Sequence, residues 1–164
     1  AHNPCLSGGG LEIFLQPQLP APRLAVVGDA PVARALAVLG PGVGFEVTAT
    51  PSGDDAALVV ASHGRDEQTA LETALTEGVP YVALVASTRR GGAVRTALDV
   101  PDALSARLHT PAGLDIGART AQEIALSILA EIVQERRTLA PRPAGGQAAD
   151  PPAAGECCQH HGAG

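Results

Sequence analysis

The sequence contains no lysine, methionine or tryptophan, and its aromatic side chains are limited to one tyrosine and two phenylalanines in 164 residues. Without a lysine, the chain has neither the cation of a Walker-type phosphate loop nor the amine of a Schiff-base enzyme. Three aromatic rings also give no stacking platform for single-stranded nucleic acid. The apolar fraction is nevertheless 45%, so the core must be built from Val, Leu, Ile and Ala, which suits a sheet covered by helices.

Positive charge is also scarce. The 11 basic residues against 17 acidic ones give a formal net charge of −6, which excludes binding to a nucleic-acid backbone through a basic face. No apolar run is long enough to span a membrane, and the first residues lack the basic and apolar regions of a secretory signal. The three cysteines, Cys5, Cys157 and Cys158, are odd in number and do not suggest a disulfide framework. These absences predict a protein of the reducing cytoplasm.

Length and composition predict one domain with two extensions. Residues 1–22 form an entry segment that contains a cysteine and is rich in glycine and proline, with a short strand expected at Leu11–Leu15. Residues 23–137 carry the regular elements and form the domain. Residues 138–164 turn to Ala, Pro and Gly and are predicted to be a disordered tail.

Short apolar runs alternate with helical segments along residues 23–137. This pattern predicts an α/β fold of Rossmann type, a parallel sheet with helices on both faces. The expected strands are Leu24–Val27, Phe45–Thr50, Leu58–Ala61, Tyr81–Ala86 and Leu108–His109. The expected helices are 31–39, Asp66–Glu77, Ala93–Leu98 and Thr120–Arg137. The last helix begins with a capping box, because Thr120 and Glu123 have the spacing at which each side chain accepts a hydrogen bond from the other residue's backbone N–H.

Ligands of such sheets bind beyond the carboxyl ends of the strands, and the first of these ends carries a glycine turn. Gly28–Ala33 follows a strand and opens a helix, as the Gly-x-Gly-x-x-Gly/Ala turn of dinucleotide-binding proteins does. Ala30 replaces the second glycine, and Asp29 adds negative charge where a phosphate would lie. Two interpretations stay open: an NAD(P) site in a small oxidoreductase, and a tight turn without a ligand.

Polar residues follow the third and fourth strands. Ser62 and His63 end the third strand, where His63 would act as a general acid or base or hydrogen-bond a cofactor. Ser87, Arg89 and Arg90 follow the fourth strand, and the two guanidinium groups suit a phosphate. A surface histidine and a solvated arginine pair explain the same residues without a ligand.

Near the start of the sequence, Cys5 lies beside Ser7, Gly8 and Gly9. A flexible glycine-rich loop can present a thiolate to a metal or sulfur centre and its backbone N–H groups to an anion. An ordinary chain end with an incidental cysteine is the alternative.

Asp115 lies between Gly113 and Gly117, ahead of the last helix. The two glycines indicate tight turns. Asp115 is therefore either a brace for Arg119 or part of the turn itself.

The tail holds four sulfur and imidazole ligands within five residues: Cys157, Cys158, His160 and His161. Thiolate and imidazole suit copper or zinc, so a copper carrier is a further hypothesis. The spacing is that of no known zinc motif, and adventitious metal binding is the alternative.

Several of these segments together resemble the XdhC/CoxI family, the accessory proteins of xanthine dehydrogenase and aerobic carbon monoxide dehydrogenase. Residues 3–9, Asn-Pro-Cys-Leu-Ser-Gly-Gly, resemble its Cys-x-Ser-Gly-Gly segment, and residues 80–90 resemble its Tyr-Val…Ser-Arg-Arg stretch. The most specific match is Pro111–Thr120, Pro-Ala-Gly-Leu-Asp-Ile-Gly-Ala-Arg-Thr, followed by Glu123–Ile132. The resemblance covers about Asn3 to Arg137.

The resemblance implies a Rossmann-like domain and a non-catalytic role in maturing a molybdenum hydroxylase. Such a protein binds the molybdenum cofactor (molybdopterin), protects it while a terminal sulfur is installed, and delivers it to the apoenzyme. A cysteine desulfurase and the hydroxylase apoenzyme would be its partners, and the sequence leaves a homodimer open. Cys5 matches the family's cysteine, and Gly28, Ala30 and Ala33 match its glycine turn. With the residues at the strand ends, the predicted cofactor contacts are Cys5, Ser7, Gly8, Gly9, Gly28, Ala30, Ala33, His63, Ser87, Arg89, Arg90 and Asp115.

Overall fold

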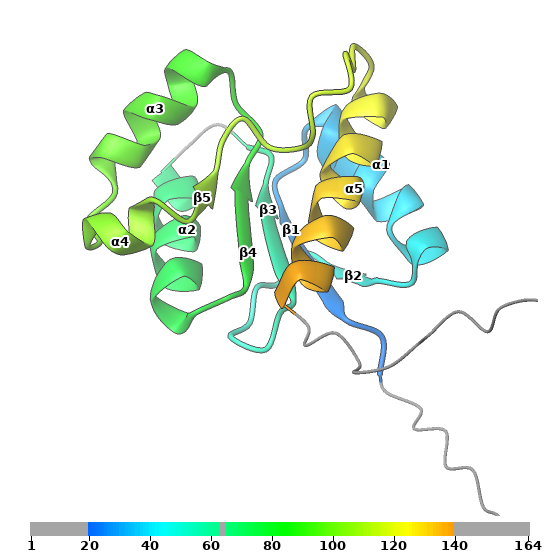
Figure 1. Cartoon of the computed structure of the whole chain (residues 1–164), viewed down its shortest axis with the longest axis horizontal. Helices are drawn as coiled ribbons and strands as arrows, with labels where there is room; N and C mark the ends of the chain where they lie inside the picture. Colours follow the sequence, from blue (N-terminus) through cyan, green and yellow to red (C-terminus); the bar gives the residue numbers. More distant parts are fainter. Residues whose placement is uncertain (1–19, 63–64, 140–164) are drawn as a thin grey trace, which may run out of the picture.

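The computed structural model describes residues 20–62 and 65–139, which fold around one parallel sheet (Figure 1). Its strands are β1 (Arg23–Val27), β2 (Glu46–Thr48), β3 (Ala57–Val60), β4 (Tyr81–Leu84) and β5 (Leu108–His109). Its helices are α1 (Pro31–Leu39), the 3₁₀ turn η1 (Pro41–Val43), α2 (Arg65–Glu77), α3 (Thr88–Ala97), α4 (Asp102–Ser105) and α5 (Ala121–Leu139). The predicted Rossmann-like α/β fold is therefore confirmed. The expected strand at Leu11–Leu15 and residues 140–164 of the expected tail lie outside the described residues. The tail was expected to begin at Thr138, but α5 continues to Leu139.

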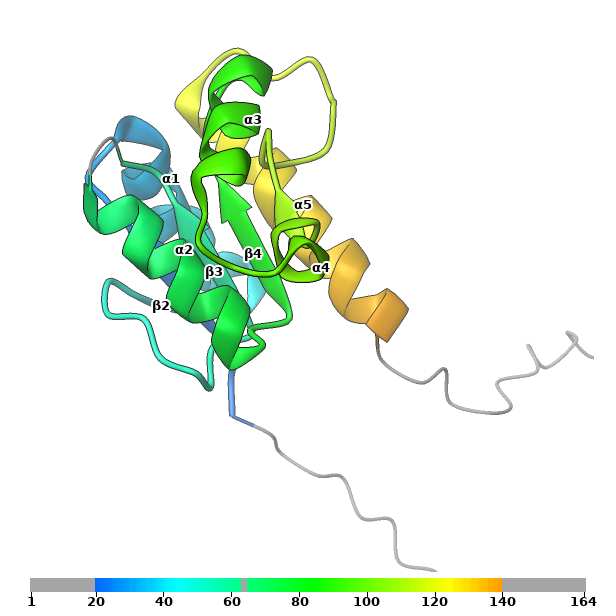
Figure 2. The same cartoon turned by 90° about the vertical axis from the view of Figure 1, so that its left-hand side faces the viewer.

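The five strands run in the order β2-β1-β3-β4-β5, and every pair is parallel. This is the doubly wound order in which the chain reverses direction between β1 and β3. Helices α1 and α5 cover one face of the sheet, and α2, α3 and α4 lie on the other (Figures 1 and 2). All strand carboxyl ends therefore meet at one edge, where ligands of such sheets bind.

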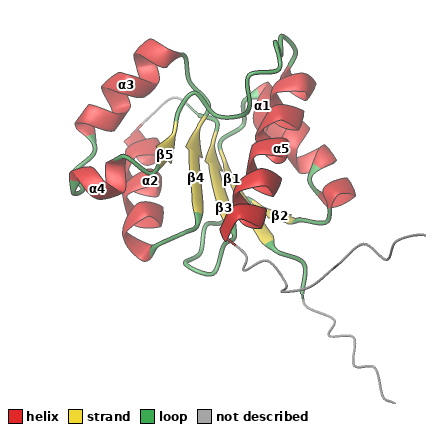
Figure 3. Ribbon diagram, viewed as in Figure 1, coloured by secondary structure: helices red, strands yellow, loops and turns green. Residues whose placement is uncertain are grey.

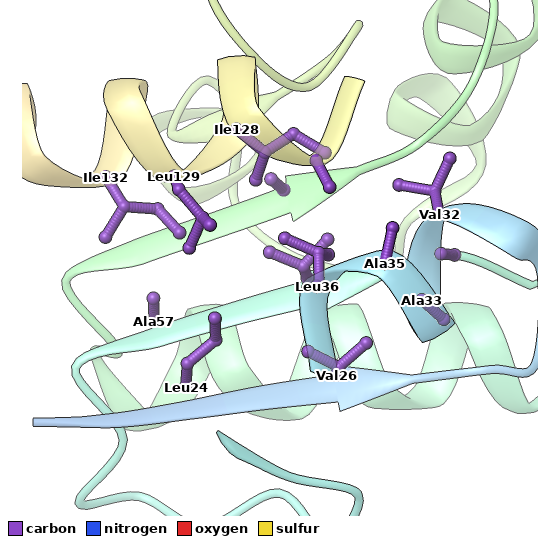
Figure 4. Packing of buried hydrophobic residues seen from close by; sticks show 14 of the residues in the cluster. Leu24, Val26, Val32, Ala33, Ala35, Leu36, Ala57, Ile128, Leu129 and Ile132 are labelled. Carbon is purple, nitrogen blue, oxygen red and sulfur yellow. The ribbon is translucent and has the colours of Figure 1, made fainter. Parts of the chain in front are cut away.

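Two aliphatic layers hold the helices to the sheet. On one face, α5 contributes Ile128, Leu129 and Ile132, which pack with α1 and with the strand residues Leu24 and Val26 (Figure 4). On the other face, Leu71 and Leu75 of α2 join a second cluster with the alternate residues of the strands. Strands buried on both sides explain why the sequence shows continuous apolar runs rather than alternation.

The connection from β2 to β3 contains no helix, although other connections along the sheet do (Figure 3). Val47 packs on the α1 and α5 side, so its neighbours Glu46 and Thr48 point to the opposite face. Arg23, which pairs with Glu46 in register, lies 3.4 Å through Nε from Oδ1 of the buried Asp55. Polar residues at this corner of the sheet thus replace the apolar layer that a covering helix would require.

Several element boundaries depart from the sequence-based prediction; strand β2, for example, covers Glu46–Thr48 rather than Phe45–Thr50. Helix α3 begins at Thr88 rather than Ala93, because the Ser87 Oγ caps it by accepting a hydrogen bond from the Arg90 N–H at 3.3 Å. Gly91 and Gly92 lie in the first turns of this helix, and because glycine is a poor helix former, the sequence did not indicate that the helix begins so early. Helix α4 was not expected, and strand β4 ends at Leu84 instead of Ala86.

The predicted capping box at the start of α5 is confirmed. The Glu123 N–H donates to Thr120 Oγ1 at 3.2 Å, and the Thr120 N–H donates to Glu123 Oε2 at 2.9 Å. A second backbone donor, the Arg119 N–H, also reaches Glu123 at 2.8 Å. These backbone donors lower the pKa of the Glu123 carboxyl, because they stabilise its charged form. None of the helices in the described ranges is long and apolar enough to cross a membrane.

The glycine turn after β1 is required by the packing of the strands themselves. Gly28 has φ = 113°, a conformation that side chains rarely adopt. A Cβ built there would meet the backbone of Ala61 and lie 2.8 Å from the Ser62 Cβ. The first glycine of the dinucleotide-like turn thus lets the ends of β1 and β3 approach each other, whether or not a ligand binds.

Replacement of this glycine is expected to destabilise the protein strongly. Gly28→Ala should lower the free energy of unfolding by at least about 2 kcal/mol, because it adds backbone strain and a clash with β3. Gly42→Ala is the matched control, since a Cβ on Gly42 meets nothing within 4 Å and its φ is not positive. Urea unfolding of the two variants measures the difference, and equal free energies would contradict this account of Gly28.

Candidate functional site

A cavity of about 760 Å³ lies beyond the carboxyl ends of β4 and β5. Its walls come from the end of β4, the first turn of α3, the segment between β5 and α5, and the start of α5. Figure 1 shows the segment between β5 and α5 passing over this edge of the sheet. The polar side chains in the walls are Ser87, Arg90, Asp115 and Ser127. The size and the mixture of apolar walls with few polar groups are those of a small-molecule site.

Arg90 is held at the cavity by a buried carboxylate. Its Nη2 donates to both oxygens of Glu67, at 2.8 and 2.6 Å, and to the Ser62 carbonyl oxygen at 3.2 Å. The Glu67 side chain is only 4% exposed, whereas that of Arg90 is 29% exposed. The other terminal nitrogen of Arg90, Nη1, is buried and has no hydrogen-bond partner among the described residues. The guanidinium is thus fixed in place with one donor group unused.

The segment from Thr110 to Gly117 lies against both α3 and α5. A Cβ on Gly91 would lie 2.9 Å from the Thr110 Cβ, so the bare glycine lets α3 approach this segment closely. Asp115 is exposed and accepts the Gly117 N–H at Oδ1 over 3.3 Å. None of the ion pairs within the described ranges joins Asp115 to Arg119, so the structure gives Asp115 a place in the turn rather than the alternative role of brace.

The Glu131 carboxylate on α5 holds the first part of this segment in place. Glu131 accepts hydrogen bonds at Oε2 from the Tyr81 hydroxyl at 2.6 Å and from the Gly113 N–H at 2.7 Å. Its Oε1 lies 3.1 Å from His109 Nδ1, and the Tyr81 and His109 rings are in contact, tilted by 31° with centroids 4.5 Å apart. One side chain of α5 therefore connects β4, β5 and the wall of the cavity.

The structure brings together only some of the sequence-predicted site residues. Ser87, Arg90 and Asp115 line one cavity. Gly28, Ala30 and Ala33 do not line it; Gly28 packs against β3, and Ala33 is buried in the core. Arg89 is exposed on α3 and is not part of the wall. The remaining candidates lie outside the described residues: Cys5, Ser7, Gly8, Gly9, His63, Cys157, Cys158, His160 and His161.

Sequence reasoning missed the two carboxylates that organise the site, Glu67 and Glu131. A signal for Glu131 was present, because it follows Ile124 and Ile128 on the apolar stripe of α5, where an acid requires partners. Glu67 gave no comparable signal, since the first turn of a helix ordinarily favours an acidic residue. Among the described residues, no group of three or more His, Cys, Asp or Glu side chains is placed to hold a metal ion.

Comparison with known proteins gives one family and several relatives. The model of the XdhC Rossmann domain matches residues 24–132. The chain is 28% identical over 160 residues to a probable xanthine dehydrogenase subunit of Bacillus subtilis, and the match covers 79% of this chain and 47% of that protein. It is 29% identical over 161 residues to the uncharacterized protein YqeB of Escherichia coli K12, covering 77% and 30%.

A solved structure shares the fold. A protein of Bacillus halodurans, whose crystal structure is described as that of a xanthine dehydrogenase, superposes with a TM-score of 0.61 at 22% identity. The match covers 80% of this chain and 46% of that one. The chain thus spans less than half the length of each of these relatives.

The environment of Tyr81 predicts a loss of stability in alkali. Burial, together with the Glu131 carboxylate, raises the pKa of Tyr81 far above its usual value near 10. Above about pH 10 the unfolded chain releases the tyrosine proton, whereas the folded chain keeps it. The free energy of unfolding should therefore fall by about 1.4 kcal/mol per pH unit. No lysine titrates in this range, because the sequence has none.

The measurement is urea unfolding between about pH 10 and pH 11.5, with tyrosinate absorption followed in the same samples. Tyr81→Phe should abolish the slope in this range. Since the sequence has one tyrosine, tyrosinate absorption should rise only as the protein unfolds. Its appearance in the folded protein near pH 10 would contradict the prediction.

Proposed function

This chain belongs to the XdhC Rossmann domain family, and on that premise we propose that it binds the molybdenum cofactor and takes part in maturing a molybdenum hydroxylase. The hydroxylase would be of the xanthine dehydrogenase or aerobic carbon monoxide dehydrogenase type. The name of the Bacillus subtilis relative, a probable xanthine dehydrogenase subunit, supports an association with a xanthine dehydrogenase system. The cofactor is cargo in this role, received and passed on without a reaction catalysed by the chain.

The cavity at the ends of β4 and β5 carries the proposal. Its wall contains most of Pro111–Ala118, part of the segment that most specifically resembles the XdhC/CoxI family. Ser87 and Arg90, from the second segment with that resemblance, line the same cavity. Two stretches separated along the sequence thus meet at one hollow on the ligand-binding edge of the sheet.

The residues present suit a pterin that carries a phosphate. The volume of about 760 Å³ lies within the range of small-molecule sites. Arg90, whose side chain is 29% exposed, supplies a positive charge at the wall. Helix α3 begins at the same wall, and its first backbone N–H groups favour an anion. The cofactor's metal end would meet Cys5, the cysteine matched by the resemblance, which lies outside the described residues.

Delivery requires two partners in this proposal. A cysteine desulfurase would supply the terminal sulfur while the cofactor is held, and the hydroxylase apoenzyme would receive it. The cavity lies at the surface edge of the sheet rather than in the core, as exchange of a bound group requires. Ile116, 53% exposed on its rim, is an apolar group that a partner would cover.

Blocking the cavity should remove the cargo. Ala118→Trp places a large side chain in the wall, so the protein purified from cells that make the cofactor should carry at least about tenfold less pterin and molybdenum than the wild type. A tenfold loss corresponds to about 1.4 kcal/mol of binding free energy. Released pterin is measured by fluorescence and molybdenum by elemental analysis.

Ala103→Trp is the matched control, because Ala103 is exposed on α4 and does not line the cavity. It should retain wild-type pterin and molybdenum. Cys5→Ser, prepared in parallel, should lower the ratio of molybdenum to pterin. Equal recovery from wild type and Ala118→Trp, or no cofactor on the wild type, would overturn the proposed function.

A further inference from the structure

A groove runs along the side of α2, where the connection from β2 to β3 crosses the sheet without a helix. Its volume is about 440 Å³, and its walls come from α2, from the end of β1 and from the connection itself. Figure 2 shows this connection passing beside α2 as a loop. The groove shares no wall residue with the cavity beyond β4 and β5, so it is a separate feature of the molecule.

The groove has the length and position of a neighbouring helix. The wall residues of α2 are Thr69, Ala70, Thr73, Ala74 and Glu77, whose spacing places them on one side of the helix over about 12 Å. Most of them are small, so a second helix can approach α2 to the usual distance of about 8–10 Å. On the other face of the sheet, α1 and α5 pack together over β1. The connection from β2 to β3 supplies no such neighbour for α2.

Accessible apolar groups line the groove near the carboxyl ends of β1 and β2. Val27, the last residue of β1, and Ala70 of α2 are half-buried, while Ala49 and Pro51 after β2 are exposed. A partner that covers these side chains gains the free energy of burying apolar surface. This part of the groove therefore favours apolar side chains in whatever binds there.

The opposite end of the groove is negative. Asp55 and Glu77 are the charged residues in its described wall, and Asp55 is balanced by Arg23, whose Nε lies 3.4 Å from its Oδ1. Glu77 is exposed and makes no hydrogen bond or ion pair within the described part of the chain. It is also the last residue of α2, where the helix's own partial negative charge disfavours a carboxylate, and no basic side chain lies in that turn. This end of the groove therefore attracts a cation.

The charges also indicate which occupant fits. A second copy of the chain brings a net charge of −6 and would be repelled by this end. Residues 1–19 carry one acidic side chain and no lysine or arginine, and residues 140–164 carry one arginine against two acidic side chains. Neither segment is cationic, so charge complementarity favours a different protein.

We propose that this groove binds an amphipathic helix of another protein, with apolar side chains against Val27 and Ala70 and a lysine or arginine beside Glu77. The bound helix lies next to α2, in the helix-in-groove mode of recognition. The proposal goes beyond the proposed function, because it gives the chain a protein-binding surface that is separate from the cavity and independent of any cofactor.

The probes are two synthetic peptides of about 18 residues, or about five turns of helix. Both carry leucines at helical spacing with one tryptophan among them, and the remaining face holds lysines in one peptide and glutamates in the other. The protein has no tryptophan, so the emission of the peptide reports burial of its apolar side. The full chain should bind the lysine peptide with a blue shift, at least about tenfold more tightly than the glutamate peptide.

Thr73→Arg separates the groove from general attraction between charges. Thr73 is exposed in the groove wall, so the arginine occupies the groove and repels the lysine peptide, whose affinity should fall at least about tenfold. Thr76→Arg is the matched control, because Thr76 is exposed on the same helix outside the wall. Its affinity for the lysine peptide should fall less than about twofold.

Glu77→Gln tests the charge without adding bulk. Loss of the unpaired carboxylate should lower the affinity for the lysine peptide by about two- to fivefold and weaken its dependence on salt. Because Glu77 is exposed, this variant keeps the test valid even if an arginine on α2 disturbs folding.

Three results would overturn the proposal: no binding of the lysine peptide to the wild type, equal affinity for the two peptides, or an equal loss in Thr73→Arg and Thr76→Arg. An affinity that falls as the protein concentration rises would assign the groove to a second copy of the chain instead. Thr73→Arg should keep the wild-type content of pterin and molybdenum, so peptide binding and cofactor recovery can fail independently.

Discussion

The carboxylate of Glu131 is the interaction on which the site end of the molecule depends. It accepts hydrogen bonds from the Tyr81 hydroxyl and the Gly113 N–H and lies beside the His109 ring. Hydrogen bonds to a charged acceptor are among the strong ones in proteins, and partial burial strengthens them further. Because Tyr81 lies on β4, His109 on β5 and Gly113 in the cavity wall, one side chain of α5 fixes the distance between the helix, the sheet edge and the wall.

At the ligand-binding edge of the sheet, the ends of β1 and β3 lie in close contact, and a cavity lies beyond β4 and β5. At the reversal point between β1 and β3, Gly28 brings the two strand ends so close that a methyl group would meet the backbone of Ala61. Arg90 adds a link from α3 to the Ser62 carbonyl oxygen. The open space lies instead beyond β4 and β5. The first glycine of the dinucleotide-like turn thus serves the packing of the strands, and the cavity described above lies elsewhere along the edge.

Local patterns were sufficient to predict the fold, and insufficient to predict the site. Strand runs, the Thr120–Glu123 capping box and the alternation of elements each depend on residues near in sequence, and each is confirmed. The contact between Arg90 and Glu67 joins residues 23 positions apart, and no spacing rule indicates it. The turn at Gly28 matched a ligand-binding pattern because the backbone conformation that a phosphate requires is also one that close strands require.

The site follows from how the backbone polar groups are satisfied. A segment between a strand and a helix exposes N–H groups that need acceptors, and in Pro111–Ala118 those acceptors come partly from outside the segment. Glu131 accepts a hydrogen bond from the Gly113 N–H, so the turn at Gly113 does not need Asp115 as an acceptor. Asp115 accepts only the long contact from Gly117 and keeps acceptor capacity for a ligand. On the facing helix, Glu67 fixes one nitrogen of Arg90, and the other has no hydrogen-bond partner among the described residues. The buried Glu67 and the half-buried Glu131 therefore hold the walls of the cavity in place without lining it themselves.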